Sequence, residues 1–271
     1  MSSVFEELVT QYDPSGGRAQ FYVEELRSRL GHLVEENPAL APFLDSMTLV
    51  LHGSTARGID DPFSDIDCWM VLDDAEMAEF DQVFEHRYIA FGANQKPGHV
   101  NPVRVSELND CFVAVDMNLI HEIRDAKVVV DRKNVFEHIQ DIARKPMSDD
   151  VRYAFFFHNY VEMRSSHRAL DNPLARGDEV ASLMGIIKTM AFVLRAGLVL
   201  DKVPYPFDKW IHVVSRLHPT PTSLLPHIGN IICKLKTDPH CLTGPESANP
   251  LSSELKEIRI KLIRKANEIG I

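Results

Sequence analysis

Apolar and polar positions follow different periods in the two halves of the chain. The first half contains short apolar runs of strand length, at 47–51, 66–72, 88–91, 112–120 and 127–131. Segments with helical spacing lie between or beside these runs, at 21–36, 75–86 and 134–144. Strand runs that alternate with helical segments are typical of an α/β domain. The pattern therefore predicts an α/β domain with a mixed sheet at residues 1–146.

Strand-like runs cease after Lys145-Pro146. Helical spacing then recurs in segments separated by prolines and turn residues, at 150–170, 178–200, 208–217, 221–236 and 251–269. Prolines end helices because they lack the backbone N–H and clash with the preceding turn. We therefore predict an all-α helical bundle domain at residues 147–271.

Three aspartates lie in the predicted strands of the first domain or directly before them. Asp65 and Asp67 enter the run at 66–72 at alternate positions, so they share one face of a strand. Asp116 lies within the run FVAVDMNLI, which we also interpret as a strand. Clustered carboxylates raise each other's pKa, and a divalent cation relieves their repulsion. The three side chains are therefore candidate ligands of Mg²⁺, which prefers oxygen ligands and often shares them with substrate phosphates.

A small-residue turn precedes the two aspartates. Gly53 and Ser54 follow the apolar run at 47–51. Glycine permits close approach of the backbone to a phosphate, and a helix start after the turn would offer unpaired N–H groups to an anion. Gly53-Ser54 alone is most simply a turn, and a surface Asp-x-Asp pair alone is common in acidic proteins, so the functional interpretation depends on their combination.

That combination resembles the signature of the nucleotidyltransferase superfamily that includes DNA polymerase β. Here it consists of LHGS, ten residues, DID, and the later VAVDMNL. The resemblance implies an enzyme that uses two Mg²⁺ ions, held by Asp65, Asp67 and Asp116, with ATP as co-substrate. It also implies that Gly53 and Ser54 bind the nucleotide.

The layout is most similar to that of bacterial aminoglycoside and lincosamide nucleotidyltransferases, in which a helical domain follows the catalytic domain. In such enzymes a lysine at a helix start reaches the nucleotide, and KVPYPFDKWIHV resembles that motif. The resemblance implies AMP transfer from ATP to a hydroxyl of a small molecule. Four further nucleotide-binding candidates are Arg57, Ser64, Tyr205 and Lys209, and the candidate general bases are Asp116 and Glu107.

The charge distribution limits the kinds of binding partner, and the cysteine content indicates the cellular compartment. Residues 1–150 carry 13 Lys and Arg against 28 Asp and Glu, a net charge of −15, whereas residues 151–271 carry 16 against 11, a net charge of +5. The acidic half disfavours a nucleic-acid partner and favours metal ions or a cationic acceptor. Four widely spaced cysteines are typical of a reducing compartment. With no signal-like start and a charge-interrupted longest apolar region, we expect a cytoplasmic protein that does not enter membranes.

Two other functions stay open at this point. The same chemistry could modify RNA or protein, since the helical half is basic. Alternatively, the chain could be a catalytically silent nucleotide-binding or toxin-antidote module. A homodimer is the default expectation for the oligomeric state.

Overall fold

The apolar runs at 47–51, 66–72 and 127–131 form three adjacent strands of one sheet. The computed structural model describes residues 15–93, 96–238, 240–244 and 249–271. The N-terminal residues that carry the expectation of an untargeted protein lie outside these ranges. The chain folds into two compact units, Met1–Lys145 and Pro146–Ile271, called here the N-terminal unit and the helical unit.

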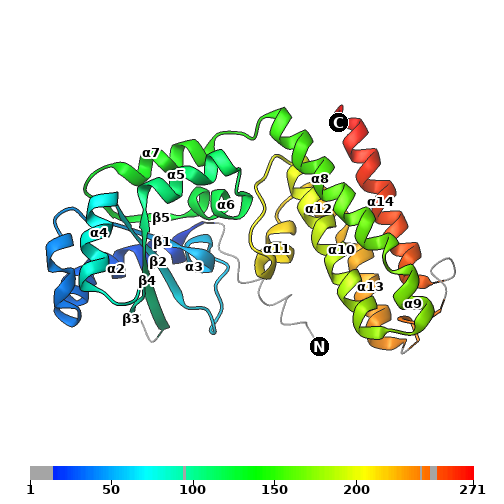
Figure 1. Ribbon diagram of the computed structural model, residues 1–271, viewed down its shortest axis with the longest axis horizontal. Helices are drawn as coiled ribbons and strands as arrows, with labels where there is room; N and C mark the ends of the chain where they lie inside the picture. Colours follow the sequence, from blue (N-terminus) through cyan, green and yellow to red (C-terminus); the bar gives the residue numbers. More distant parts are fainter. Residues whose placement is uncertain (1–14, 94–95, 239, 245–248) are drawn as a thin grey trace. The chain divides into compact units, whose positions relative to one another are not determined.

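The N-terminal unit is built on a mixed five-stranded sheet in the order β3-β4-β2-β1-β5 (Figure 1). Its strands are β1 (Thr48–His52), β2 (Ile66–Leu72), β3 (Ile89–Ala93), β4 (Lys96–Arg104) and β5 (Lys127–Asp131). β1 pairs antiparallel with β2 and β5, and β3 pairs antiparallel with β4. β2 and β4 are parallel neighbours. The predicted mixed-sheet α/β fold followed by an all-α region is confirmed.

Helices cover both faces of this sheet, as Figure 1 shows. The helices of this unit are α2 (Gly17–Glu36), η1 (Pro38–Phe43), α3 (Gly53–Arg57), α4 (Asp74–Val83), α5 (Val105–Ala114), α6 (Met117–Asp125) and α7 (Val135–Arg144). Residues of α2, η1 and α4 form one apolar core with alternate strand positions such as Leu49 and Met70. Residues of α5, α6 and α7 form a second core with the opposite positions, including Val50 and Trp69. Strand alternation thus explains why both faces are buried.

The predicted strand at 112–120 is wrong. α5 ends at Ala114, Val115 takes a left-handed conformation at φ 50°, and Asp116 becomes the N-cap of α6. The Asp116 carboxylate accepts hydrogen bonds from the backbone N–H groups of Asn118 and Leu119. Helix capping by this side chain overrides the period-two alternation, because a capping carboxylate satisfies N–H groups that no helical carbonyl can reach.

The strand β4 was not predicted. It contains Pro97 and Pro102, and prolines within a run argue against a strand because they cannot donate to the ladder. β4 nevertheless lies between β2 and β3, and it extends the predicted strand at 88–91 into a hairpin. β4 contributes one residue to the candidate site.

The helical unit consists of α8 (Asp149–Arg168), α9 (Asp171–Arg176), α10 (Glu179–Leu200), α11 (Asp208–Ser215), α12 (Pro219–Thr222), α13 (Leu225–Thr237) and α14 (Pro250–Glu268). Side-chain caps start three of the long helices: Ser148 for α8, Asp178 for α10 and Asn249 for α14. α10 packs against α8, α11, α12 and α14. By length and composition α10 would also pass as a membrane span, but 56% of its most apolar window is buried inside the structure, as expected for a core helix.

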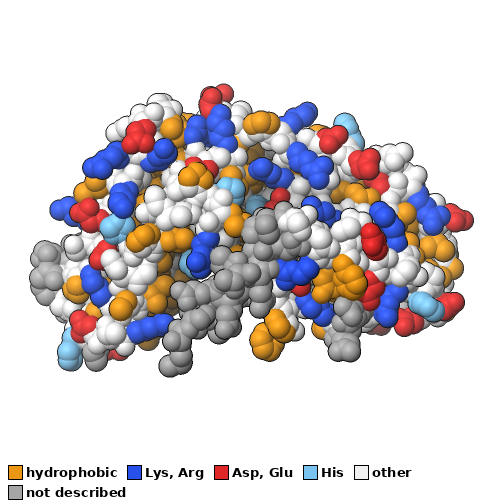
Figure 2. Space-filling model, turned by 180° about the vertical axis from the view of Figure 1, so that it is seen from behind, with side chains coloured by type: hydrophobic (Ala, Val, Ile, Leu, Met, Phe, Trp, Pro, Cys, Tyr) orange, Lys and Arg blue, Asp and Glu red, His pale blue; other side chains and the backbone are white. Residues whose placement is uncertain are grey.

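Charges of both signs lie on the surface. On the face shown in Figure 2, Lys and Arg side chains are interspersed with Asp and Glu side chains. The acidic excess of the first half is therefore not gathered into a single acidic surface on that face.

Candidate metal centre

One continuous segment, β1–α3–β2, presents the two aspartates. Asp67 lies opposite His52 in the β1–β2 ladder, and Asp65 precedes β2 by one residue. α3 starts at Gly53, directly after β1. Gly53 has φ 72°, and a Cβ atom at this position would lie 2.6 Å from Asp67 Oδ2. Only glycine combines this backbone conformation with so close an approach to a carboxylate.

Gly53→Ala should therefore damage both the fold and the centre. A residue with a β-carbon in the left-handed conformation lowers the stability of the fold by about 1–3 kcal/mol. The new methyl group must also displace the Asp67 carboxylate. We expect a lower urea midpoint of unfolding and weaker divalent-cation binding. Gly31→Ala is the matched control, because a Cβ there meets nothing within 4 Å and alanine favours the interior of α2. Equal stability of the two variants would contradict this account of Gly53.

A histidine from β4 completes the cluster. His99 is paired with Asp67 in the parallel β2–β4 ladder, so both side chains project from the same face. His99 Nε2 lies 2.8 Å from Asp67 Oδ1, and His99 Nδ1 lies 3.5 Å from Asp65 Oδ2. The imidazole stacks on Tyr88, with ring centroids 5.1 Å apart and 22° between the planes. The ring orientation is thus fixed by contacts on several sides.

These three side chains fit a divalent cation. One ligand atom from each of Asp65, Asp67 and His99 lies within 4.8 Å of the others. The Asp65 side chain is 49% exposed, while those of Asp67 and His99 are 17% and 16% exposed. The cluster therefore has a solvent-facing side, through which a cation could share ligands with a bound substrate.

The comparison with known protein families agrees with the position of this cluster. The model of the family described as "Nucleotidyltransferase domain" matches residues 33–157, a range that includes the sheet and all three side chains of the cluster. The chain therefore matches a nucleotidyltransferase domain over residues 33–157. Such a domain implies a nucleotide substrate.

A solved structure also resembles the chain. It is a nucleotidyltransferase-like protein from Exiguobacterium sibiricum 255-15, with 11% sequence identity and a TM-score of 0.46. The similarity covers 90% of this chain and 75% of that one. No curated protein matches the chain.

A buried ion pair stabilises the glycine turn at the start of α3. Glu122 of α6 accepts a hydrogen bond from the Gly53 backbone N–H at 3.1 Å and one from Arg57 Nη1 at 2.9 Å. The side chains of Glu122 and Arg57 are 5% and 6% exposed. Burial alone would raise the pKa of Glu122, but His52 and Arg57 outweigh it and lower the pKa to about 2. The carboxylate is therefore ionised and holds the start of α3 in place.

This contact changes the interpretation of two predicted residues. Arg57 directs one guanidinium nitrogen to Glu122 inside the domain, so its evident role is to position α3. Gly53 is a predicted nucleotide contact, and its backbone N–H donates to the same carboxylate. Sequence analysis missed Glu122 because the helix that carries it, α6, was not predicted.

The predicted third ligand, Asp116, is not part of the cluster formed by Asp65, Asp67 and His99. It caps α6 and is exposed there. His99 stands beside Asp67 instead. Sequence analysis missed His99 because neither β4 nor its parallel pairing with β2 was predicted.

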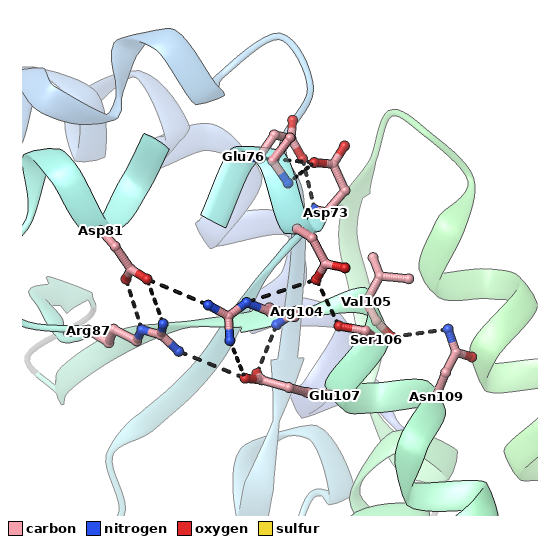
Figure 3. A network of polar contacts seen from close by, with 11 residues as sticks. Asp73, Glu76, Asp81, Arg87, Arg104, Val105, Ser106, Glu107 and Asn109 are labelled. Carbon is pink, nitrogen blue, oxygen red and sulfur yellow. Dashed lines mark hydrogen bonds and ion pairs between the residues drawn. The ribbon is translucent and has the colours of Figure 1, made fainter. Parts of the chain in front are cut away.

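The candidate base Glu107 lies in an ion-pair network at the other end of the same strands (Figure 3). Its carboxylate accepts hydrogen bonds from the backbone N–H and the guanidinium of Arg104, and Arg87 lies 3.9 Å away. Arg104 is paired with Leu72, five residues along the ladder from the pairing of His99 with Asp67. At about 3.3 Å per residue the two pairs are roughly 16 Å apart. The structure therefore does not bring Glu107 to the metal centre.

The other predicted nucleotide contacts lie in three places. Ser54 is buried in α3, and Ser64 exchanges hydrogen bonds with Asp61 in the loop before β2. Tyr205 is buried in the helical unit, where the Arg195 guanidinium lies 5.4 Å from the centre of its ring. Lys209 is exposed as the second residue of α11. Their contacts with a nucleotide remain predictions.

Proposed function

We propose that the chain is a divalent-cation-dependent adenylyltransferase that transfers AMP from ATP to a hydroxyl group of a small molecule and releases pyrophosphate. The observation that carries this proposal is the approach of Gly53 to Asp67, beside Asp65, within a nucleotidyltransferase domain. A carboxylate pair next to a glycine turn suits a cation that is shared with a triphosphate.

The roles of the side chains follow from their positions. Asp65 and Asp67 would hold the cation, and the sequence predicts two Mg²⁺ ions at this site. A bound cation would neutralise charge on the triphosphate and orient it for in-line attack. Glu122 and Arg57 would keep the Gly53 turn rigid against Asp67, so that the carboxylates are preorganised before substrate binds.

For the acceptor we propose a hydroxylated, cationic small molecule, of which aminoglycosides are the first choice and lincosamides the second. The support is the net charge of −15 on residues 1–150, which attracts cations at low ionic strength. We also propose a cytoplasmic setting, which agrees with four free cysteines, three of them buried.

The experiment is incubation with ATP, a divalent cation and a panel of aminoglycosides and lincosamides, with pyrophosphate release and product mass as readouts. We expect one acceptor to gain the mass of a single AMP group. Labelling of RNA or protein, with every small molecule unmodified, would replace the small-molecule proposal with a macromolecular acceptor. ATP binding without any transfer would indicate a silent nucleotide-binding module.

A further inference from the structure

We propose that His99 is a metal ligand, and that Asp65, Asp67 and His99 together form a mixed carboxylate–imidazole centre that selects Mn²⁺ over Mg²⁺. The inference builds on the proposed function, because it concerns the cation of the same site. It begins from the neighbours of His99, which differ from those of an ordinary surface histidine.

Both ring nitrogens of His99 face the carboxylate pair. Nε2 lies 2.8 Å from Asp67 Oδ1 and Nδ1 lies 3.5 Å from Asp65 Oδ2. The parallel register places the His99 backbone directly beside that of Asp67, and the stack on Tyr88 restrains the ring plane. The imidazole is therefore held against the two carboxylates by backbone pairing as well as by side-chain contacts.

The spacing of the ligand atoms suits a six-coordinate ion. Adjacent ligands of such an ion, each about 2.1 Å from the metal, are about 3 Å apart, and opposite ligands are about 4.2 Å apart. The 2.8 Å between His99 Nε2 and Asp67 Oδ1 matches adjacent ligands, and the 4.8 Å within which one ligand atom from each of the three residues lies is slightly wider than the spacing of opposite ligands. One ring nitrogen can bind the ion while the other donates to a carboxylate, which is the usual arrangement around a metal-bound histidine.

The donor set decides which cation is preferred. Mg²⁺ binds oxygen ligands and loses its water reluctantly, whereas imidazole nitrogen suits first-row transition metals. A neutral imidazole also carries one negative charge fewer than a third carboxylate, which weakens the attraction for a hard ion. Among the transition metals, Mn²⁺ best tolerates the two carboxylates that complete the set.

A second role for His99 would give the same geometry. A protonated imidazole could neutralise Asp65 and Asp67 by itself, and the centre would then need no cation. The two roles predict different effects of His99→Asp on cation binding. A third carboxylate would improve Mg²⁺ binding relative to Mn²⁺ at a metal centre, whereas at a charge-neutralised pair it would create cation binding where none existed.

The test uses the full chain, stripped of metal by chelation, with Mn²⁺ as the probe. Pulsed electron paramagnetic resonance of bound Mn²⁺ should show coupling to a ¹⁴N nucleus in the unmodified protein and none in His99→Asp. Calorimetric titrations with Mn²⁺ and with Mg²⁺ should show that the ratio of the two affinities shifts toward Mg²⁺ by about tenfold or more in the variant. His138→Asp, an exposed change of the same charge on α7, should alter neither result.

Three outcomes overturn the inference. They are Mn²⁺ binding without nitrogen coupling, an unchanged Mn²⁺ to Mg²⁺ ratio in His99→Asp, and cation binding that occurs only in that variant. Thermal unfolding of the metal-free proteins shows whether His99→Asp is folded, and His99→Gln provides a neutral second variant that should also lose the nitrogen coupling. Failure of the proposed function is separate, since it would leave the nitrogen-coupled Mn²⁺ signal intact but yield no AMP transfer.

Discussion

Asp67→Asn should reduce nucleotidyl transfer by at least about 10²- to 10³-fold, the range observed when one transition-state-stabilising group is removed from an active site. Asp67 lies between the two other parts of the centre, because its Oδ1 faces His99 and its Oδ2 faces Gly53. Asparagine keeps the size of the side chain but removes the charge that would bind a cation.

The stability of this variant distinguishes a functional carboxylate from a structural one. Asparagine keeps an oxygen that can face His99, and repulsion with Asp65 disappears, so the metal-free protein should be at least as stable as the unmodified one. Initial rates and urea denaturation measure the two effects. Asp45→Asn is the control, because its side chain is fully exposed and its ion pair with Arg132 is long, at 3.5 Å. Near-normal turnover in Asp67→Asn would remove this cluster from the reaction.

Glu122→Gln should have the largest effect on stability, about 3–5 kcal/mol. The amide oxygen can still accept one of the two hydrogen bonds, but the NH2 group then faces the other donor, and the buried guanidinium of Arg57 loses its counter-charge. Adding Arg57→Met to this variant should recover part of the loss, because no buried charge then remains at the pair. Glu24→Gln, on the exposed side of α2, should be close to neutral. Chemical denaturation of the four proteins gives the comparison.

The same carboxylate predicts how stability depends on pH. The pKa of Glu122 falls from an ordinary value of 4.5 to about 2 in the folded protein, so the unfolded chain binds more protons between these values. The stabilisation, about 3 kcal/mol, is complete above pH 4.5 and is lost as the pH falls toward 2. In Glu122→Gln this part of the acid dependence should be absent. An acid transition identical in both proteins would show that another group controls it.

The sequence predicted those residues of the centre that lie within one continuous segment of the chain. Gly53, Asp65 and Asp67 lie within one strand–turn–strand segment, and their relation follows from strand alternation and the conformational freedom of glycine. His99 and Glu122 could not be placed in this way. His99 reaches the site through the pairing of β4 with β2, and Glu122 through the docking of α6 behind α3.

At Asp116 the sequence pattern and the structure disagree. Its segment alternates apolar and polar residues as a strand does, and the resemblance placed a third carboxylate there. In the structure two short helices meet at this point, and the carboxylate binds backbone N–H groups. A capping aspartate between short helices and a ligand aspartate within a strand have the same local sequence, so only tertiary contacts distinguish them.

The parallel neighbour of β2 has a consequence for how such a centre can change over time. The segment from β1 to β2 carries Gly53, Asp65 and Asp67 and forms by pairing strands that are close along the chain. His99 belongs to a separate strand, reached only after α4 and β3. A single substitution at position 99 can therefore exchange the donor atom offered to the cation while leaving the glycine turn and both aspartates intact. Variation at position 99 is therefore independent of how the segment that carries the glycine turn folds.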